Sequence, residues 1–318
     1  MKLTRFAKYS WFVLAYTLGV ILWGAFVRAT GSGAGCGNHW PTCNGQIIPR
    51  PEEIETVIEL THRVTSAFLG VLIIIMVVWA FRLYAPGHVV RKAAVLSLIF
   101  VIIEGLIGAG LVIFELVGLN QSGERAIAMA LHLVNTLILV GFLTLTAWWG
   151  SGGRVPQWDG QRRINWLIGI GVVGMMVVGA SGAITALGDT LFIHKGVPIE
   201  SSPTTEFLVQ LRIWHPALAV VTGLFVVLAS TAVYRMRPSN QTRLFARLVK
   251  ATFIIQLFAG VLNVYLMVPV WMQLVHLLLA DIIWILWVLL GATALAEPAR
   301  QASTTPQPTA DRLKTSKV

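Results

Sequence analysis

The sequence predicts an all-α membrane protein with eight transmembrane helices, arranged as two similar four-helix bundles. Its 318 residues have a mean hydropathy of +0.75, and only 12 % of them are charged. A soluble domain of this size would carry roughly 25 % charged residues. Apolar runs long enough to cross a bilayer recur along the chain, whereas a β-barrel would need alternating segments of about ten residues, which the sequence lacks.

The apolar runs are each about 18–25 residues long, which suffices for a membrane-spanning helix. We expect spans at 11–29, 60–82, 93–114, 126–149, 164–184, 208–234, 248–267 and 271–295. Lys2, Arg5 and Lys8 precede the first run, as basic residues precede a signal peptide. That run is longer than a typical signal sequence and has no clear cleavage site before Arg28, so we expect an uncleaved span.

The net charge of +10 indicates topology rather than nucleic-acid binding, because the basic residues are unevenly placed. With the N-terminus in the cytoplasm, 18 of the 24 lysines and arginines fall in cytoplasmic segments. The six on the outer side are Arg28, Arg50, Arg63, Arg125, Lys195 and Arg212. This positive-inside pattern predicts a multi-pass protein of the cell membrane with both termini in the cytoplasm.

A polar link rich in glycine and arginine divides the chain into halves of similar length. We expect an N-terminal unit at 1–149, a cytoplasmic linker at 150–163, a C-terminal unit at 164–296 and a disordered cytoplasmic tail at 297–318. The two halves share a pattern of residues, which predicts an internal repeat of the same orientation. The matched pairs are His62 and His215, Glu104 and Gln256, Gly24 and Gly179, and His132 and His276.

Four histidines lie in the outer part of the even-numbered spans, about 5–10 Å deep. They are His62, His132, His215 and His276. Two histidines per unit on different helices suit the two axial positions of one haem iron. A structural zinc needs four ligands in one place, so the pattern predicts two haem sites. A polar helix–helix contact is the alternative for any single one. His39, His88 and His194 have no repeat partner and are expected at the surface.

The two predicted sites differ one turn outward from a histidine. Glu59 precedes His62 by three residues, whereas Arg212 precedes His215 by three. A cation suits a haem propionate, and a carboxylate can act as a base or stabilise a developing positive charge. We therefore expect chemistry in the first unit and electron transfer in the second. The alternative for Glu59 is an ion pair with Arg63.

For the other polar residues, the sequence offers two or more candidate roles each. Arg63, Arg125 and Arg212 are candidate propionate contacts, with interfacial anchoring as the alternative. Cys36 and Cys43 enclose six residues in the first outer loop, where a disulfide can persist. Free thiols, or a metal site with His39, are the alternatives. Glu104 and Asp281 lie about 15 Å deep and suit either a proton relay or hydrogen-bonded neutral acids.

The Cys-x6-Cys loop, the Glu-x-x-His-Arg motif, the histidines on spans 2, 4, 6 and 8 and the repeat together resemble the haem A synthase family. The resemblance covers the whole chain except the tail. It implies oxidation of a ring methyl of haem O to a formyl group, giving haem A for haem-copper oxidases. It also implies roles for named residues: His62 and His132 at the substrate haem, His215 and His276 at a haem b, and Cys36–Cys43 as the outer-loop pair.

Conversion of a methyl to an aldehyde is a four-electron oxidation, for which Glu59 is the catalytic candidate. The expected partners are lipid, a prenyltransferase that makes haem O, an electron acceptor and a second copy of the chain. The main alternative function is a dihaem cytochrome b that oxidises quinol. A transporter built around Glu104 and Asp281 is a further alternative. A prenyltransferase is disfavoured because the sequence has no aspartate-rich diphosphate-binding motif.

Overall fold

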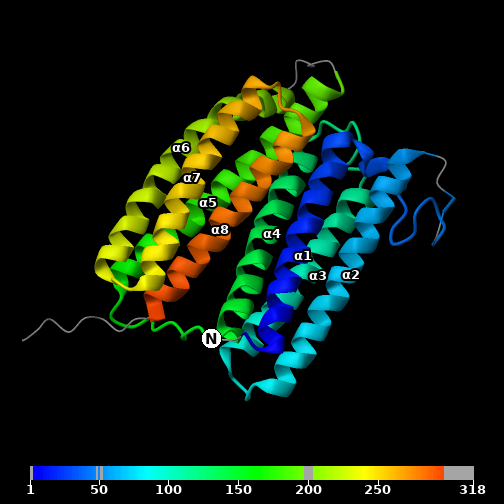
Figure 1. Ribbon diagram of the computed structural model, residues 1–318. Coiled ribbons are helices and arrows are strands. Elements are labelled where there is room, and N and C mark those ends of the chain that lie inside the picture. The colour runs from blue at the N-terminus through cyan, green and yellow to red at the C-terminus, as the bar shows by residue number, and fades with distance from the viewer. Residues whose placement is uncertain (1–2, 48, 51–52, 197–202, 297–318) are drawn as a thin grey trace, which may run out of the picture.

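The computed structural model describes residues 3–47, 49–50, 53–196 and 203–296 (Figure 1). Within these ranges, eight helices are long and apolar enough to cross a membrane, which confirms the predicted all-α, multi-pass fold. The helices are α1 Arg5–Thr30, α2 Ile54–Leu83, α3 Val89–Ile113, α4 Gly123–Gly150, α5 Arg162–Gly188, α6 Pro203–Met236, α7 Asn240–Tyr265 and α8 Val270–Ala296. The predicted tail, 297–318, lies outside the described residues.

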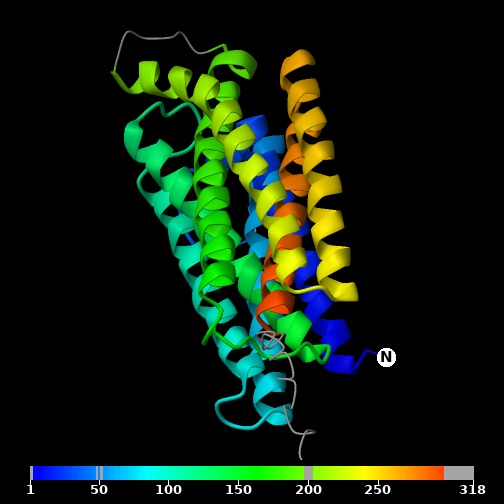
Figure 2. The same ribbon diagram turned by 90° about the vertical axis from the view of Figure 1, so that its left-hand side faces the viewer.

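The helices pack as two closed cycles of four. In the first cycle α1 contacts α2 and α4, and α3 contacts the same two helices; in the second, α5, α6, α7 and α8 repeat this order. The cycles meet where α1 and α4 pack against α5 and α8. Figure 1 accordingly has α4 and α8 in the middle, with α2 and α3 on one side and α6 and α7 on the other. Figure 2 shows that the helix axes are nearly parallel, apart from the first part of α6, which lies across the others at one end before the helix bends.

Apolar side chains fill the inside of each cycle and also cover its outside. One buried cluster centres on α1, α2 and α4 and includes Trp284 of α8. A second cluster joins α5, α6, α7 and α8 around Trp287, which is fully buried. On the outside, Val221 and Phe258 are 69 % and 72 % exposed, as expected of side chains that face lipid.

Several helices begin earlier than the hydropathy of the sequence predicts. α1 begins at Arg5, where the Thr4 hydroxyl accepts a hydrogen bond from the Ala7 amide. α7 begins at Asn240 behind a capping box formed by Ser239 and Thr242. Polar first turns lower the local hydropathy without preventing a helix. α2 likewise begins with a polar first turn, at Ile54, so Glu59 lies in its second turn and not before its start.

One arginine joins the two halves at the cysteine-loop end, which we define as the end where α1 finishes and α2 begins. Arg28 of α1 donates from Nη1 to the Ala186 carbonyl at 2.5 Å and to Thr190 Oγ1 at 2.7 Å. Its Nη2 donates to Gln273 Oε1 of α8 at 2.9 Å. Thr190 belongs to a π-helical turn, Asp189–His194 (η2), that follows α5. Arg28 therefore fixes α5 and α8 against α1.

Replacing Arg28 with alanine should weaken this junction. Hydrogen bonds to charged groups each contribute about 1.5–3 kcal/mol, and three are lost. We expect the unfolding temperature of the purified protein to fall by about 10 °C or more, at about 2–4 °C per kcal/mol. Arg82 is exposed near the end of α2, so Arg82→Ala is the matched control. An equal effect of the two substitutions in a thermal unfolding assay would contradict the role assigned to Arg28.

Candidate functional site

The four predicted histidines lie in two pairs, one pair in each cycle of helices. Each occupies the part of its helix nearer the cysteine-loop end: His62 in α2, His132 in α4, His215 in α6 and His276 in α8. His62 and His132 are close enough for their rings to interact electrostatically, and so are His215 and His276. The structure thus brings together the same pairs that the sequence predicts, from helices that face each other across a cycle.

Three of the histidine rings rest against glycines on neighbouring helices. A Cβ atom added to any of these glycines would approach a ring Cε1 atom closely. The distances are 2.8 Å from Gly24 to His62, 3.0 Å from Gly182 to His215, and 3.2 Å from Gly260 to His276. Small residues let side chains and backbones approach within a membrane bundle. These glycines therefore leave the space that the rings occupy, a role not foreseen from their place in the repeat.

Most of the ring nitrogens lack hydrogen-bond partners. In the part of the chain that the structure describes, Nδ1 of His62, His132 and His276 is buried without one. Nδ1 of His215 lies 2.9 Å from Ser181 Oγ, which leaves its Nε2 available. A neutral imidazole nitrogen is a common iron ligand. Paired histidines with open ring nitrogens fit the two axial positions of a haem.

Glu104 of α3 lies beside His132, with Oε1 3.4 Å from Nδ1. Asn135 donates to Glu104 Oε2 at 2.5 Å, and the Thr136 hydroxyl donates to Oε1. The interpretation of Glu104 as a hydrogen-bonded group between helices is therefore correct. Its closeness to His132 was missed, because hydropathy and spacing do not reveal which faces of α3 and α4 meet.

Asp281 of α8 behaves differently. Its side chain is fully buried, and neither carboxylate oxygen has a hydrogen-bond partner among the described residues. The expectation that it is hydrogen-bonded between helices is wrong. Asp281 lies on α8, which packs against α1 and α4 of the first cycle as well as α5 and α7 of the second.

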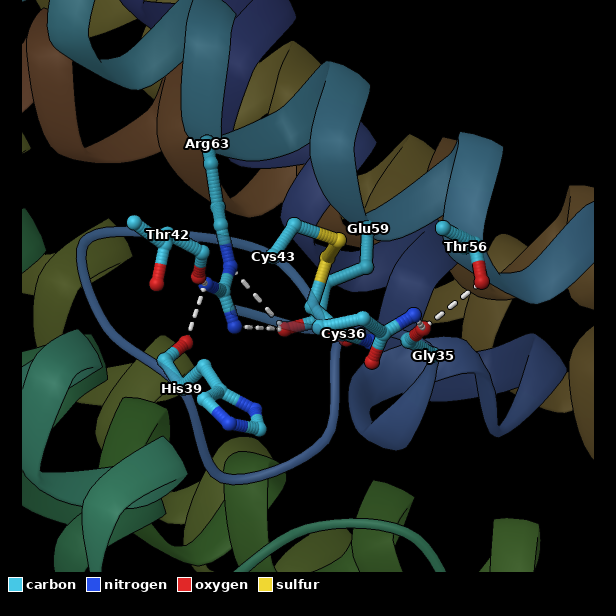
Figure 3. A network of polar contacts seen from close by, with 9 residues as sticks. Gly35, Cys36, His39, Thr42, Cys43, Thr56, Glu59 and Arg63 are labelled. Carbon is cyan, nitrogen blue, oxygen red and sulfur yellow. Dashed lines mark hydrogen bonds and ion pairs between the residues drawn. A yellow bond between two sulfur atoms is a disulfide. The ribbon is translucent and has the colours of Figure 1, made fainter. Parts of the chain in front are cut away.

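Glu59 is 4 % exposed, and two donors hold its carboxylate (Figure 3). Arg63 donates to Oε1 from Nη2 at 2.5 Å and from Nε at 3.1 Å. The backbone amide of Cys36 donates to Oε2 at 2.8 Å. The ion pair that the sequence offered as an alternative is present. The bond from Cys36 was not foreseen, and it attaches the loop between α1 and α2 to this carboxylate.

That loop is closed by the predicted disulfide between Cys36 and Cys43. Arg63 reaches across to it and donates from Nη1 to the carbonyls of His39 and Thr42, both at 2.7 Å (Figure 3). His39 thus contributes its backbone, and the alternatives of free thiols or a metal site do not apply. The loop, the arginine and the carboxylate form one connected unit above His62.

The three candidate propionate contacts have different surroundings. Four hydrogen bonds to Glu59 and the loop use most of the donors of Arg63. Arg125 donates from Nη1 to the Gly118 and Asn120 carbonyls, and its buried Nε has no partner in the described part of the chain. Arg212 lies in α6, but its side chain is outside what the structure describes.

Comparison with known proteins places the chain in a family. Residues 7–288 match the COX15-CtaA family, described as cytochrome oxidase assembly protein. The chain belongs to this family. A Thermus thermophilus protein named protoheme IX farnesyltransferase is 47 % identical over 305 residues, which cover 94 % of this chain and 50 % of that protein. The chain therefore spans about half the length of this relative.

Two other relatives of similar length are named haem A synthase. The one from an Exiguobacterium species is 31 % identical over 257 residues, which cover 80 % of this chain and 81 % of the relative. The one from Geobacillus kaustophilus is 30 % identical over 283 residues, covering 84 % and 85 %. These findings confirm the resemblance to the haem A synthase family that the sequence motifs indicated.

Gly35 fixes how closely the disulfide loop approaches α2. A Cβ atom at this position would lie 2.4 Å from the backbone carbon of Glu55 and 2.6 Å from the amide of Thr56. We expect Gly35→Ala to lift the loop from the helix and to break the bond from Cys36 to Glu59. Hydrogen–deuterium exchange at the Cys36 amide should then become at least about tenfold faster, since breaking the bond costs about 1.5 kcal/mol or more.

Gly33 provides the matched control. A Cβ atom there would meet Val117 at 3.5 Å and Val27 at 3.9 Å, both ordinary contact distances. Gly33→Ala should leave exchange at Cys36 unchanged. If both variants exchange at the wild-type rate, Gly35 does not set the position of the loop.

Proposed function

We propose that this chain is a haem A synthase, which oxidises the ring methyl of haem O to the formyl group of haem A. The observation that carries the proposal is the pairing of His62 with His132, one helical turn from the buried carboxylate of Glu59. Membership of the haem A synthase family supports the same conclusion. In the proposed reaction the methyl group and one water give the aldehyde, four protons and four electrons.

The N-terminal unit, residues 1–149, would hold the substrate. His62 and His132 would bind the iron of haem O through their Nε2 atoms, and Arg125 would contact a propionate through its unpartnered Nε. Oxidation of the methyl group builds positive charge beside it. Glu59, held by Arg63 and the Cys36 amide, would stabilise that charge as a fixed anion.

The C-terminal unit, residues 164–296, would bind a haem b cofactor through His215 and His276. This group supplies a route for electrons away from the substrate. Ser181 would orient His215 by its contact with Nδ1. Gly182 and Gly260 would keep both rings in place. The linker 150–163 would separate the two units.

The cysteine-loop end would face the outside of the cell membrane, with both termini in the cytoplasm. The distribution of lysine and arginine supports this orientation. The Cys36–Cys43 disulfide supports it too, because disulfides persist outside the cytoplasm. Both histidine pairs would then lie toward the outer side.

The relative from Thermus supports a partner. It is named protoheme IX farnesyltransferase, and about half of its length matches this chain. We propose that an enzyme which farnesylates haem, and so makes haem O, supplies the substrate. A membrane electron acceptor would complete the reaction, and haem-copper oxidases would receive the haem A.

Pigment analysis tests the function. The protein is expressed together with a haem O source and purified, and its haems are extracted and separated. We expect haem A together with haem B from the wild-type protein. Haem B alone would overturn the proposal in favour of a dihaem cytochrome b, and a preparation without a haem band would favour a transporter.

The same assay tests Glu59. Glu59→Gln should keep both haems but stop conversion at haem O or at the alcohol stage, with at least about a hundredfold less haem A, because it removes the proposed electrostatic stabilisation. Glu53→Gln is the matched control, since Glu53 is exposed at the start of the same helix. Normal haem A production by Glu59→Gln would show that its carboxylate is not catalytic.

Gly24 provides a test of the substrate site that does not depend on turnover. The added Cβ of Gly24→Ala would push the His62 ring, 2.8 Å away, out of position. We expect the haem content of the first site to fall by about tenfold, while the second site stays filled. Alanine favours a helix over glycine, so the loss would not reflect a weaker α1.

Gly19 lies on the same helix, and nothing would lie within 4 Å of its added Cβ. Gly19→Ala should therefore bind haem like the wild-type protein. Haem content per protein, measured by pyridine haemochrome spectra, distinguishes the two variants. Full occupancy of both sites in Gly24→Ala would argue against His62 as a ligand.

A further inference from the structure

Glu104 is the carboxylate nearest to a proposed haem ligand in the first half, and it is not part of the reaction described above. Its Oε1 atom lies 3.4 Å from Nδ1 of His132. This Nδ1 is buried and makes no hydrogen bond within the described residues, so a small rotation of either side chain would give it Glu104 as an acceptor. The other ring nitrogen, Nε2, would then serve the iron.

Two donors from α4 hold this carboxylate in place. Asn135 donates to Oε2 and also to the Phe100 carbonyl, at 2.5 Å and 2.9 Å, so its amide is itself anchored to α3. The Thr136 hydroxyl donates to Oε1. Asn135 and Thr136 are both buried. A carboxylate whose two oxygens both accept hydrogen bonds is held in one orientation, and such groups commonly orient metal-binding histidines.

The second half has a neutral arrangement at the matching place. Gln256 corresponds to Glu104 in the repeat, but its Nε2 lies 3.2 Å from Nε2 of His276, whereas Glu104 lies beside Nδ1 of His132. The positions that match Asn135 and Thr136 are Leu279 and Ala280. The second half therefore lacks the carboxylate and also lacks both side chains that donate to it. Ser181, which contacts His215, is also neutral.

We propose that Glu104 is a positioning residue, which accepts a hydrogen bond from His132 and makes it a stronger ligand than its counterpart His276. The inference rests on the proposed haem sites. A carboxylate that accepts from the far nitrogen of a ligating histidine raises its basicity and favours the ferric iron. The first site therefore has a lower midpoint potential than a site with neutral partners. Electron transfer from the haem at the first site to the haem at the second site is then favourable.

A redox titration of the purified haem-loaded protein tests this, with each haem assigned through the His132→Ala and His276→Ala variants. The Glu104→Gln substitution gives the first half the glutamine that the second half has at the matching position. We expect a tenfold weaker preference for ferric iron, which raises the first midpoint potential by about 59 mV for one electron. The second potential should not change. Gln256→Ala, which removes a neutral partner, should shift the second potential less.

An unchanged first potential in Glu104→Gln, with haem bound, would overturn the proposal, since a purely structural role would not affect the potential. Loss of haem from the first site alone, with a normal unfolding temperature, would support the positioning role. If Glu104→Gln retains neither haem, the titration is made on Glu104→Asp, which keeps the charge but withdraws it by one methylene. A rise is again expected, and an unchanged value overturns the proposal.

The titration does not need turnover. A protein that carried haem B at both sites and made no haem A would refute the proposed function, yet the effect of Glu104 on the first potential could still be measured. The proposed function and the proposed role of Glu104 can therefore be refuted independently of each other.

Discussion

An ionised carboxylate inside a membrane-spanning bundle is stabilised by hydrogen-bond donors from the protein, because lipid and apolar side chains offer none. Glu59 obtains them from two directions: Arg63 on its own helix and the Cys36 amide in the loop. Arg63 then continues to the loop carbonyls of His39 and Thr42. Satisfying one carboxylate in this way attaches the disulfide loop to α2. The position of the loop, the burial of Glu59 and the surroundings of His62 all depend on these bonds.

Hydrogen-bond partners also distinguish the polar groups that join helices from the polar groups that have no partner in the protein. Arg28 and Glu104 are paired, and their partners join helices: Arg28 connects the two halves, and Glu104 connects α3 to α4. Nδ1 of His62 and Nδ1 of His132 are buried without hydrogen-bond partners among the described residues. Leaving such groups unpaired costs free energy. Glu104 lies 3.4 Å from Nδ1 of His132 and would satisfy it, which leaves Nε2 for the proposed haem iron.

The sequence predicts the architecture well because the eight helices depend on hydropathy, which is local, and the pairing of histidines depends on a repeat that is visible in the residues. It predicts contacts between helices poorly. The Arg28 junction joins residues more than 150 positions apart, and the closeness of Glu104 to His132 depends on how two helices are rotated. The start of α2 was missed because polar first turns lower the hydropathy, which is why Glu59, just outside the expected span 60–82, lies in the second turn of the helix.

The two halves share a helix order and differ in their charges. At two positions where the repeat departs near a histidine, Glu59 against Arg212 and Glu104 against Gln256, the first half has a carboxylate and the second does not. Both of these carboxylates are held by donors that the structure provides. Glu59, paired with Arg63, lies on the loop side of His62, and Glu104 lies beside His132, so each histidine of the first pair has a carboxylate nearby. The proposed oxidation builds positive charge on the substrate, and these two carboxylates would stabilise that charge in this half of the protein.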